Sequence, residues 1–155
     1  MLQQICEHIH NYFIKDSYDG KFEIADGMIS LPLLDGQRFL IIGSALNDGM
    51  YTYCDTGIMN DDNTEAVGLQ AETFTGTICG LAVPPAVISL AGEIKAWVDT
   101  YGAVVNSPYQ SESVIGVYSY QKSSGGRSGN GNDVKPVSWQ DTFREQLNRW
   151  RKVAF

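Results

Sequence analysis

The residues that could carry chemistry in this chain are one cysteine near a histidine and a run of serines. Cys6 and His10 stand four positions apart, which would place a thiol and an imidazole one turn apart on a helix. Nucleophilic catalysis also needs a third group that orients the base, and this pair has no obvious one. The serines from Ser111 to Ser119 have no obvious base, because both histidines lie in the first ten residues. We therefore predict that the chain has no catalytic residue. The alternative is an enzyme that uses Cys6 or one of these serines as its nucleophile.

Residues that could bind a metal do not fall at the spacing of a known site. The acidic residues that follow Cys54 are Asp55, Asp61, Asp62 and Glu65. They lack the D-x-[DN]-x-[DN]-G frame of a calcium loop and its glutamate at the twelfth position, so we predict a solvated acidic loop. His8 and His10 stand two positions apart and would point away from each other on a helix. We predict no metal ion and no cofactor.

Cysteine usage and length place the chain in a broad class. The chain has three cysteines, an odd number, at the widely spaced positions Cys6, Cys54 and Cys79. This spacing fits neither a disulfide framework nor a metal site, so we predict that the cysteines act as small buried hydrophobic residues. The 155 residues correspond to a single domain, 1–155. No apolar run approaches the roughly 18 residues of a membrane span, and no secretory signal is visible. We expect no membrane contact and folding in a cytoplasm.

The net charge of the chain changes sign near residue 135. Residues 1–134 hold 6 Lys and Arg against 16 Asp and Glu, a net of −10. Residues 135–155 hold 5 Lys and Arg against 2 Asp and Glu, a net of +3, which brings the total to −7. A basic tail on an acidic body can dock on a second copy of that body, on another acidic partner or on phosphate. The alternative is a solvated helix face.

The first 80 residues predict one helix followed by a β-rich segment. Apolar residues at helical spacing indicate a helix that starts at Leu2 and ends near Lys15. From residue 21 to 80, short runs are separated by turn residues such as Asp26-Gly27. The expected strands lie at 22–24, 28–31, 38–42, 50–54 and 73–79, with a surface loop at 56–72. They indicate a small, strongly bent antiparallel sheet or barrel.

A central helix is expected to organise the rest of the chain. In the stretch 84–101, apolar residues recur at steps of three and four: Val87, Ala91, Ile94, Val98 and Tyr101. The paired prolines suit the first turn, and Gly102 is expected as the C-terminal cap. Gly92, in the middle, requires either another backbone packed closely against it or a helix that tolerates the loss.

The C-terminal part predicts a strand, a flexible segment and a last helix. β-branched and aromatic residues between 111 and 120 indicate an extended piece, which with the central helix makes up segment 81–120. Segment 121–137 is rich in glycine and serine and is expected to be a flexible loop. Ser138 and Asp141 indicate a capped helix over 138–152, with Phe143, Leu147 and Trp150 facing inward.

Two phrases in the C-terminal part carry a family resemblance. The matching residues of the first phrase, SESVIGVYSY, are Ser111, Glu112, Ser113, Ile115, Gly116, Tyr118, Ser119 and Tyr120. Those of the second, at the end of the chain, are Leu147, Trp150, Arg151 and Lys152. Over residues 81–152 this order resembles the head-tail connector (head completion, neck adaptor) proteins of long-tailed bacteriophages and prophages, in which a phrase like SESIGDYSVSY precedes a variable loop and a last helix ending in L-YRR. Upstream, GQRFLIIGSALNDGMYTY resembles the phrase GQYFRIVGSVFNDGVYQY of prophage proteins from Gram-positive bacteria.

The resemblance implies an α+β fold. Its N-terminal, central and C-terminal helices would form a helical connector core, with a small antiparallel β-sheet or barrel inserted at 21–80. It implies a structural protein that forms a ring and joins the capsid portal to the tail. Its partners would be the portal protein, other neck or tail proteins and further copies of itself, while DNA would pass through the lumen without specific binding. Such a protein would assemble in the cytoplasm of the bacterial host and remain in the virion neck.

The basic end of the chain is predicted to make the contact with another subunit or with the portal. The residues predicted to do so are Arg144, Arg149, Trp150, Arg151 and Lys152. Trp150 would be an aromatic anchor, and a core position in its own subunit is the alternative. The loop at 121–137 would become ordered on docking. A competing prediction is a small β-barrel module that binds a ligand or sugar in a pocket lined by Tyr51, Tyr53 and Phe74.

Overall fold

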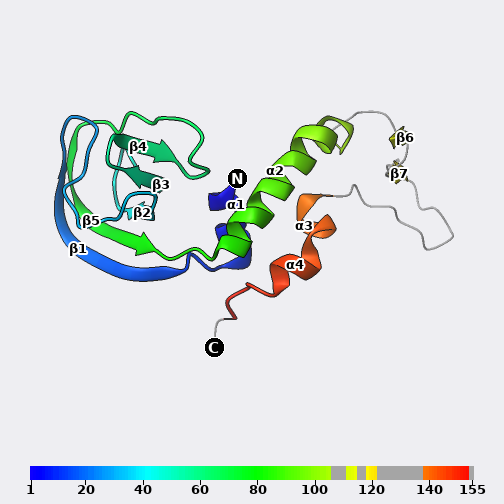
Figure 1. The fold of residues 1–155 in the computed structure, drawn as a ribbon, viewed down its shortest axis with the longest axis horizontal. Coiled ribbons are helices and arrows are strands. Elements are labelled where there is room, and N and C mark those ends of the chain that lie inside the picture. Colours follow the sequence, from blue (N-terminus) through cyan, green and yellow to red (C-terminus); the bar gives the residue numbers. More distant parts are fainter. Residues whose placement is uncertain (106–110, 115–117, 122–137, 154–155) are drawn as a thin grey trace. The chain divides into compact units, whose positions relative to one another are not determined.

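The computed structural model describes residues 1–105, 111–114, 118–121 and 138–153 (Figure 1). Of the predicted flexible segment 121–137, only Gln121 belongs to the described residues. The elements, in chain order, are α1 (Leu2–Ile9), β1 (Ile14–Ile24), β2 (Arg38–Ile42), β3 (Gly49–Cys54), β4 (Gly57–Asn60), β5 (Glu72–Leu81), α2 (Pro85–Val105), β6 (Ser111–Val114), β7 (Tyr118–Gln121), α3 (Trp139–Thr142) and α4 (Arg144–Asn148).

A five-stranded antiparallel sheet is the main element of the first 81 residues. Its strand order is β1-β5-β2-β3-β4, so the first and fifth strands pair although 47 residues separate them. The ladder between β1 and β5 runs from Ile14↔Leu81 to Ile24↔Glu72, with an irregularity between Ile14 and Asp16. These two long strands curve together around the shorter ones (Figure 1). The prediction of a strongly bent antiparallel sheet is therefore correct.

Alternation along the strands builds a core on one face of the sheet. The buried cluster consists of Ile24, Ile29, Phe39, Ile41, Ile58, Leu69, Phe74 and Ile78. Leu40 and Cys79, which are next to members of this cluster on β2 and β5, are also buried, as is Met50 on β3. The side chain of Gln3 accepts a hydrogen bond from the Met50 backbone N–H (3.0 Å), which places the start of α1 beside β3.

The predicted helical connector core with an inserted sheet is wrong. The sheet dominates the fold, and three of the four helices among the described residues are short, with 8, 4 and 5 residues in α1, α3 and α4. The sheet is also not an insertion at 21–80, because its longest strand begins at Ile14. The expected strand at 28–31 is reduced to one isolated bridge, between Ala25 and Met28. The expected surface loop at 56–72 contains a further strand, β4.

The first helix ends earlier than its apolar pattern predicts. His10 adopts the left-handed conformation (φ 54°), and its N–H and that of Asn11 bond back to the last turn. Phe13 is also at positive φ. The apolar residues Tyr12 and Phe13 therefore belong to the connection into β1, and they do not extend the helical face.

The central helix confirms the prediction of a buried face but not that of its end. Val87, Leu90, Ala91 and Ile94 are buried at steps of three and four. The helix continues through Gly102, which has no positive φ, to Val105. A Cβ at Gly92 would meet nothing within 4 Å, so here the helix simply tolerates a glycine. Among the described residues no helix combines the length and apolar character needed to cross a membrane.

The predicted last helix over 138–152 is wrong in extent, although its start is correct. Ser138 caps α3, because its hydroxyl oxygen accepts a hydrogen bond from the Asp141 N–H (3.2 Å). Phe143 leaves helical geometry (φ −102°, ψ 16°) and separates α3 from α4, which ends at Asn148. Leu147 is fully buried, and the Phe143 ring lies edge-to-face on Trp97.

The described residues form two compact units. The first contains Met1–Ala91 together with the end of the chain from Trp150 onward, and the second spans Gly92–Arg149.

Candidate functional site

The end of the chain lies against the C-terminal end of α1. The Lys152 N–H donates to the Ile9 carbonyl (3.0 Å), and the Asn11 side-chain amide donates to the Trp150 carbonyl (2.9 Å). The Trp150 ring lies edge-to-face on Phe13, with centroids 6.1 Å apart. The last carbonyls of a helix lack partners within it, so the early end of α1 leaves Ile9 as an acceptor for this segment. The basic end is thus held in place by its own subunit.

The Arg151 guanidinium approaches His8 on the same helix. Its Nη2 atom lies 3.2 Å from the His8 Nε2 atom. A guanidinium can only donate, so in this contact Nε2 is the acceptor and carries no proton. The contact therefore requires a neutral His8 imidazole.

The predicted contact residues differ in exposure. Arg144, Arg149, Arg151 and Lys152 are exposed, whereas Trp150 is half-buried. Arg144 forms an ion pair with Asp141 (2.6 Å). The pKa of the Asp141 carboxyl is lowered, first by its hydrogen bond with the Ser138 hydroxyl and second by Arg144. The contact of Trp150 with Phe13 gives it an intramolecular role. Its use as an anchor for a partner stays a prediction.

The residues of the SESVIGVYSY phrase lie on a two-stranded hairpin. Ser111, Glu112 and Ser113 belong to β6, and Tyr118, Ser119 and Tyr120 belong to β7. The strands pair antiparallel from Ser111↔Gln121 to Val114↔Tyr118. Ile115 and Gly116 lie outside the described residues.

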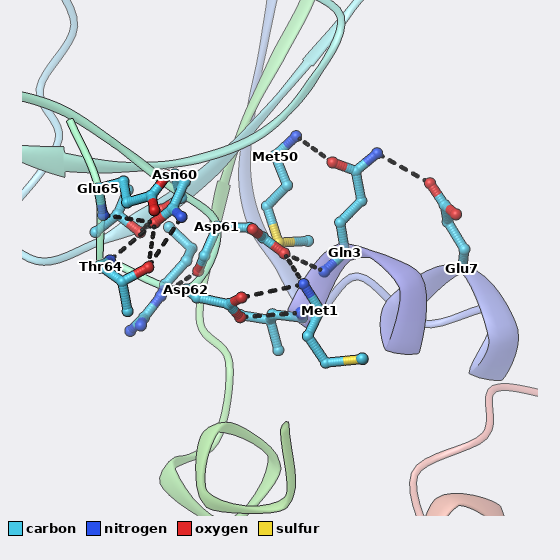
Figure 2. Close-up of polar contacts among 12 residues, drawn as sticks. Met1, Gln3, Glu7, Met50, Asn60, Asp61, Asp62, Thr64 and Glu65 are labelled. Atoms are coloured by element: carbon cyan, nitrogen blue, oxygen red, sulfur yellow. Dashed lines mark hydrogen bonds and ion pairs between the residues drawn. The ribbon is translucent and has the colours of Figure 1, made fainter. Parts of the chain in front are cut away.

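Two carboxylates that the sequence places in a solvated loop instead cap the start of α1 (Figure 2). Asp61 accepts hydrogen bonds from the Gln3 N–H (2.9 Å) and the Met1 ammonium (3.0 Å). Asp62 accepts from the Leu2 N–H (3.2 Å) and from the same ammonium (3.1 Å). The first N–H groups of a helix have no partner within it and carry partial positive charge, so acidic side chains are stabilising there. Asp61 and Asp62 follow β4 directly and lie about 60 residues from the helix that they cap, so no local pattern in the sequence indicates this role.

This junction shifts the pKa values of its charged groups. Burial alone would raise the pKa of the Asp61 carboxyl, but the Gln3 N–H and the Met1 ammonium hold it below its usual value. Burial alone would lower the pKa of the Met1 ammonium, but hydrogen bonds to Asp61 and Asp62 raise it. Both shifts favour the charged forms, so α1 is fastened to the loop after β4 by an ion pair.

A second polar network shapes the loop between β2 and β3. Glu72 accepts hydrogen bonds from the Ser44 hydroxyl, the Ala45 N–H (2.9 Å) and the Asn47 side-chain amide (3.1 Å). The Ser44 hydroxyl and these amides hold the pKa of the Glu72 carboxyl below its usual value. Ser44 and Asn47 are themselves buried. The phrase GSALNDG is therefore a loop-building motif, which accounts for its residues without catalysis.

The residues of the two alternative sites are engaged in packing. Phe74 is in the buried cluster, Tyr51 and Tyr53 pack against it, and the Tyr51 hydroxyl donates to the Asn47 carbonyl (2.9 Å). Two surface clefts, of about 510 and 310 Å³, are lined by other residues. Burial, followed by the charge of Asp61, raises the pKa of the Cys6 thiol to about 12, so it is protonated at neutral pH. Cys79 is also buried and Cys54 is partly exposed.

No group of three or more histidine, cysteine, aspartate or glutamate residues suited to a metal ion occurs within the described part of the chain.

Comparisons with family models, with curated proteins and with solved structures each found no match to the chain.

Proposed function

We propose that this chain is a structural protein of bacteriophage or prophage assembly, which joins the capsid portal to the tail as a head-tail connector. The proposal rests on the resemblance over residues 81–152 and on one observation, the exposed basic end of the chain. Arg149, Arg151 and Lys152 are exposed on a segment that hydrogen bonds to α1. The connector would act in the cytoplasm of the bacterial host during assembly and then in the virion neck.

The charge distribution supports docking through this segment. The first 134 residues carry a net charge of −10, and the last 21 carry +3. A basic end therefore meets a complementary surface on another copy of the same chain or on an acidic portal face. Because Lys152 is hydrogen bonded to Ile9 and Trp150 to Asn11, their segment loses less conformational entropy on binding than a free tail would.

The acidic body suits a channel through which DNA passes. Negative side chains repel the phosphate backbone, and phosphate contacts supply most nonspecific affinity for DNA. A ring of such subunits would let DNA slide without specific binding. Assembly into a ring requires two complementary faces on each subunit, related by a rotation that closes.

Light scattering on the purified protein, alone and mixed with the portal protein of the same prophage, tests the proposal. We expect a complex whose mass exceeds that of either component. A protein that ignores the portal at high concentration contradicts the connector function.

A further inference from the structure

The two edges of the five-stranded sheet differ in whether the chain covers them. Beyond β4, the Val67 N–H donates to the Ile58 carbonyl (2.9 Å) and the Asn60 N–H donates to the Glu65 carbonyl (2.9 Å). Met59 and Ala66 form an isolated bridge there. Beyond β1, at the other edge, the described part of the chain contributes no strand. Within the described residues the sheet therefore has one open edge, which is 11 residues long.

An open edge strand presents unpaired backbone N–H and C=O groups, which can pair with another strand. Because the β4 edge is covered, two copies of this sheet can join only through β1 of each. Such a contact uses the same surface on both copies and is symmetric. The partner strand is then β1 itself, running antiparallel.

Charges along β1 discriminate among the symmetric registers. One residue opposes itself on the twofold axis, and the residues on either side of it oppose each other in order. With Tyr18 on the axis, Lys15 opposes Lys21, and with Asp19 on the axis, two aspartates face each other. With Gly20 on the axis, Asp19 opposes Lys21 twice, and no like charges face each other. Like charges directly opposite are destabilising, and opposite charges are favourable.

The Gly20 register also pairs most of the strand. It aligns Asp16 with Ile24 and Tyr18 with Phe22, on both sides of the axis. Axis positions nearer to either end of Ile14–Ile24 pair shorter stretches and form fewer backbone hydrogen bonds. At the axis, Gly20 has no side chain, and a Cβ there would meet nothing within 4 Å in the single subunit.

We propose that two copies of this chain associate through β1, antiparallel about a twofold axis at Gly20, into one continuous ten-stranded sheet. This inference rests on the open edge and the charge order of β1. It is independent of the connector function, which uses the basic end of the chain. Lys21 and Asp19 are both exposed and free to face a partner, with Asp19 accepting one hydrogen bond from Thr77.

Sedimentation equilibrium at low ionic strength tests the pairing of Asp19 with Lys21 across the axis. One variant reverses the charge of Lys21, and a second exchanges the charges of the two residues. Lys21→Asp replaces two attractive pairs with two repulsive ones, and we expect the dimer dissociation constant to rise at least about fivefold. Lys15→Asp is the matched control, because it makes the same charge change on the same strand. In the Gly20 register Lys15 opposes Ala25, beyond the end of β1, so its dissociation constant should change less than about twofold. The double exchange Asp19→Lys/Lys21→Asp restores opposite charges and should bring dimerisation back.

Amide hydrogen exchange gives a second measurement on the unaltered chain. Protection of β1 amides should rise with protein concentration, since dimerisation pairs N–H groups that face solvent in one copy. A monomer at the highest concentration overturns the proposal. Equal weakening by Lys21→Asp and Lys15→Asp, or a double exchange that fails to restore the dimer, overturns it as well. Portal binding does not enter either readout, so the dimer and the connector function can fail separately.

Discussion

At the scale of single residues, close backbone approaches and long-range hydrogen bonds determine what can be changed. Gly76 on β5 lies beside the end of β2, the strand that pairs with it, and a Cβ there would overlap the Ile42 carbonyl oxygen. That oxygen belongs to the backbone and cannot rotate away. Gly92 in α2 has open space around the same position. The two positions hold the same residue type but have opposite surroundings.

We predict that Gly76→Ala lowers the free energy of unfolding by at least about 2 kcal/mol, because the strands must separate to admit the methyl group. Gly92→Ala is the matched control and should raise it by about 0.5–1 kcal/mol, since alanine favours the helix. Urea unfolding of both variants measures the difference. Equal effects of the two substitutions would show that β2 and β5 do not approach closely at Gly76.

The junction between Met1 and Asp61 predicts a pH dependence. The Asp61 pKa is lowered from its usual 3.8, so its stabilisation is present above that pH and is lost as the pH falls through the lower folded value. The Met1 ammonium pKa is raised from 8.0, so its stabilisation is complete below that pH and is lost as the pH rises through the higher folded value.

Asp61→Asn should therefore destabilise the chain most between these two limits, by about 1–3 kcal/mol. The difference from the unaltered chain should shrink at both ends of this range. Thermal unfolding over a pH series, on the chain that begins at Met1, measures it. Asp55→Asn is the control, because Asp55 is exposed and lies in the same acidic region. A difference that does not vary with pH would contradict the ion pair.

At the scale of elements, loops are held by residues distant in sequence. The loop between β2 and β3 owes its shape to Glu72, which is 28 residues from Ser44. Leu46 is half-exposed (52%). It follows Ser44 and Ala45, whose hydroxyl and backbone N–H groups donate hydrogen bonds to the Glu72 carboxylate. The loop therefore presents an apolar side chain on a backbone fixed from β5.

We predict that Glu72→Ala speeds amide exchange at Ala45 and Leu46 and lowers the melting temperature. Both N–H groups donate to the Glu72 carboxylate, at 2.9 and 3.4 Å, and would lose their partner. Glu65→Ala is the control, since Glu65 is exposed and its backbone, not its side chain, makes the contacts in the covered edge. Unchanged exchange at Ala45 in the Glu72 variant would contradict the network.

At the scale of the whole molecule, local patterns in the sequence predicted more than long-range ones could. The apolar run at Arg38–Ile42, the turn at Asn47-Asp48-Gly49 and the periodicity of α2 are local, and each predicted that its element exists, although α2 ends later than expected. The end of α1 was missed because His10 and Phe13 take positive φ, which their residue types do not announce. Pairing of β1 with β5 and capping by Asp61 join residues far apart, and no local pattern encodes them.

The same limit explains the error in fold class. Apolar spacing predicted helices over Leu2–Lys15 and over 138–152, and the resemblance implied that they form a helical core. Tyr12 and Phe13 instead lie in a connection, and Phe143 breaks the last helix. The candidate contact residues were chosen from charge and from the resemblance. The four basic residues are exposed, as that choice requires, whereas Trp150 is half-buried. The contacts of Trp150 with Phe13 and of Arg151 with His8 could not be predicted from spacing.

The central claim is that the basic end of the chain docks on an acidic partner, and one measurement addresses it most directly. Light scattering of mixtures with the portal protein should be compared for Lys152→Glu and Lys15→Glu, two reversals of an exposed lysine with equal change in net charge. The backbone hydrogen bond from Lys152 to Ile9 is retained in the first variant. We predict that Lys152→Glu weakens the complex at least about fivefold while Lys15→Glu leaves it unchanged. Equal binding by the two variants, or no complex with the unaltered chain, would contradict the account.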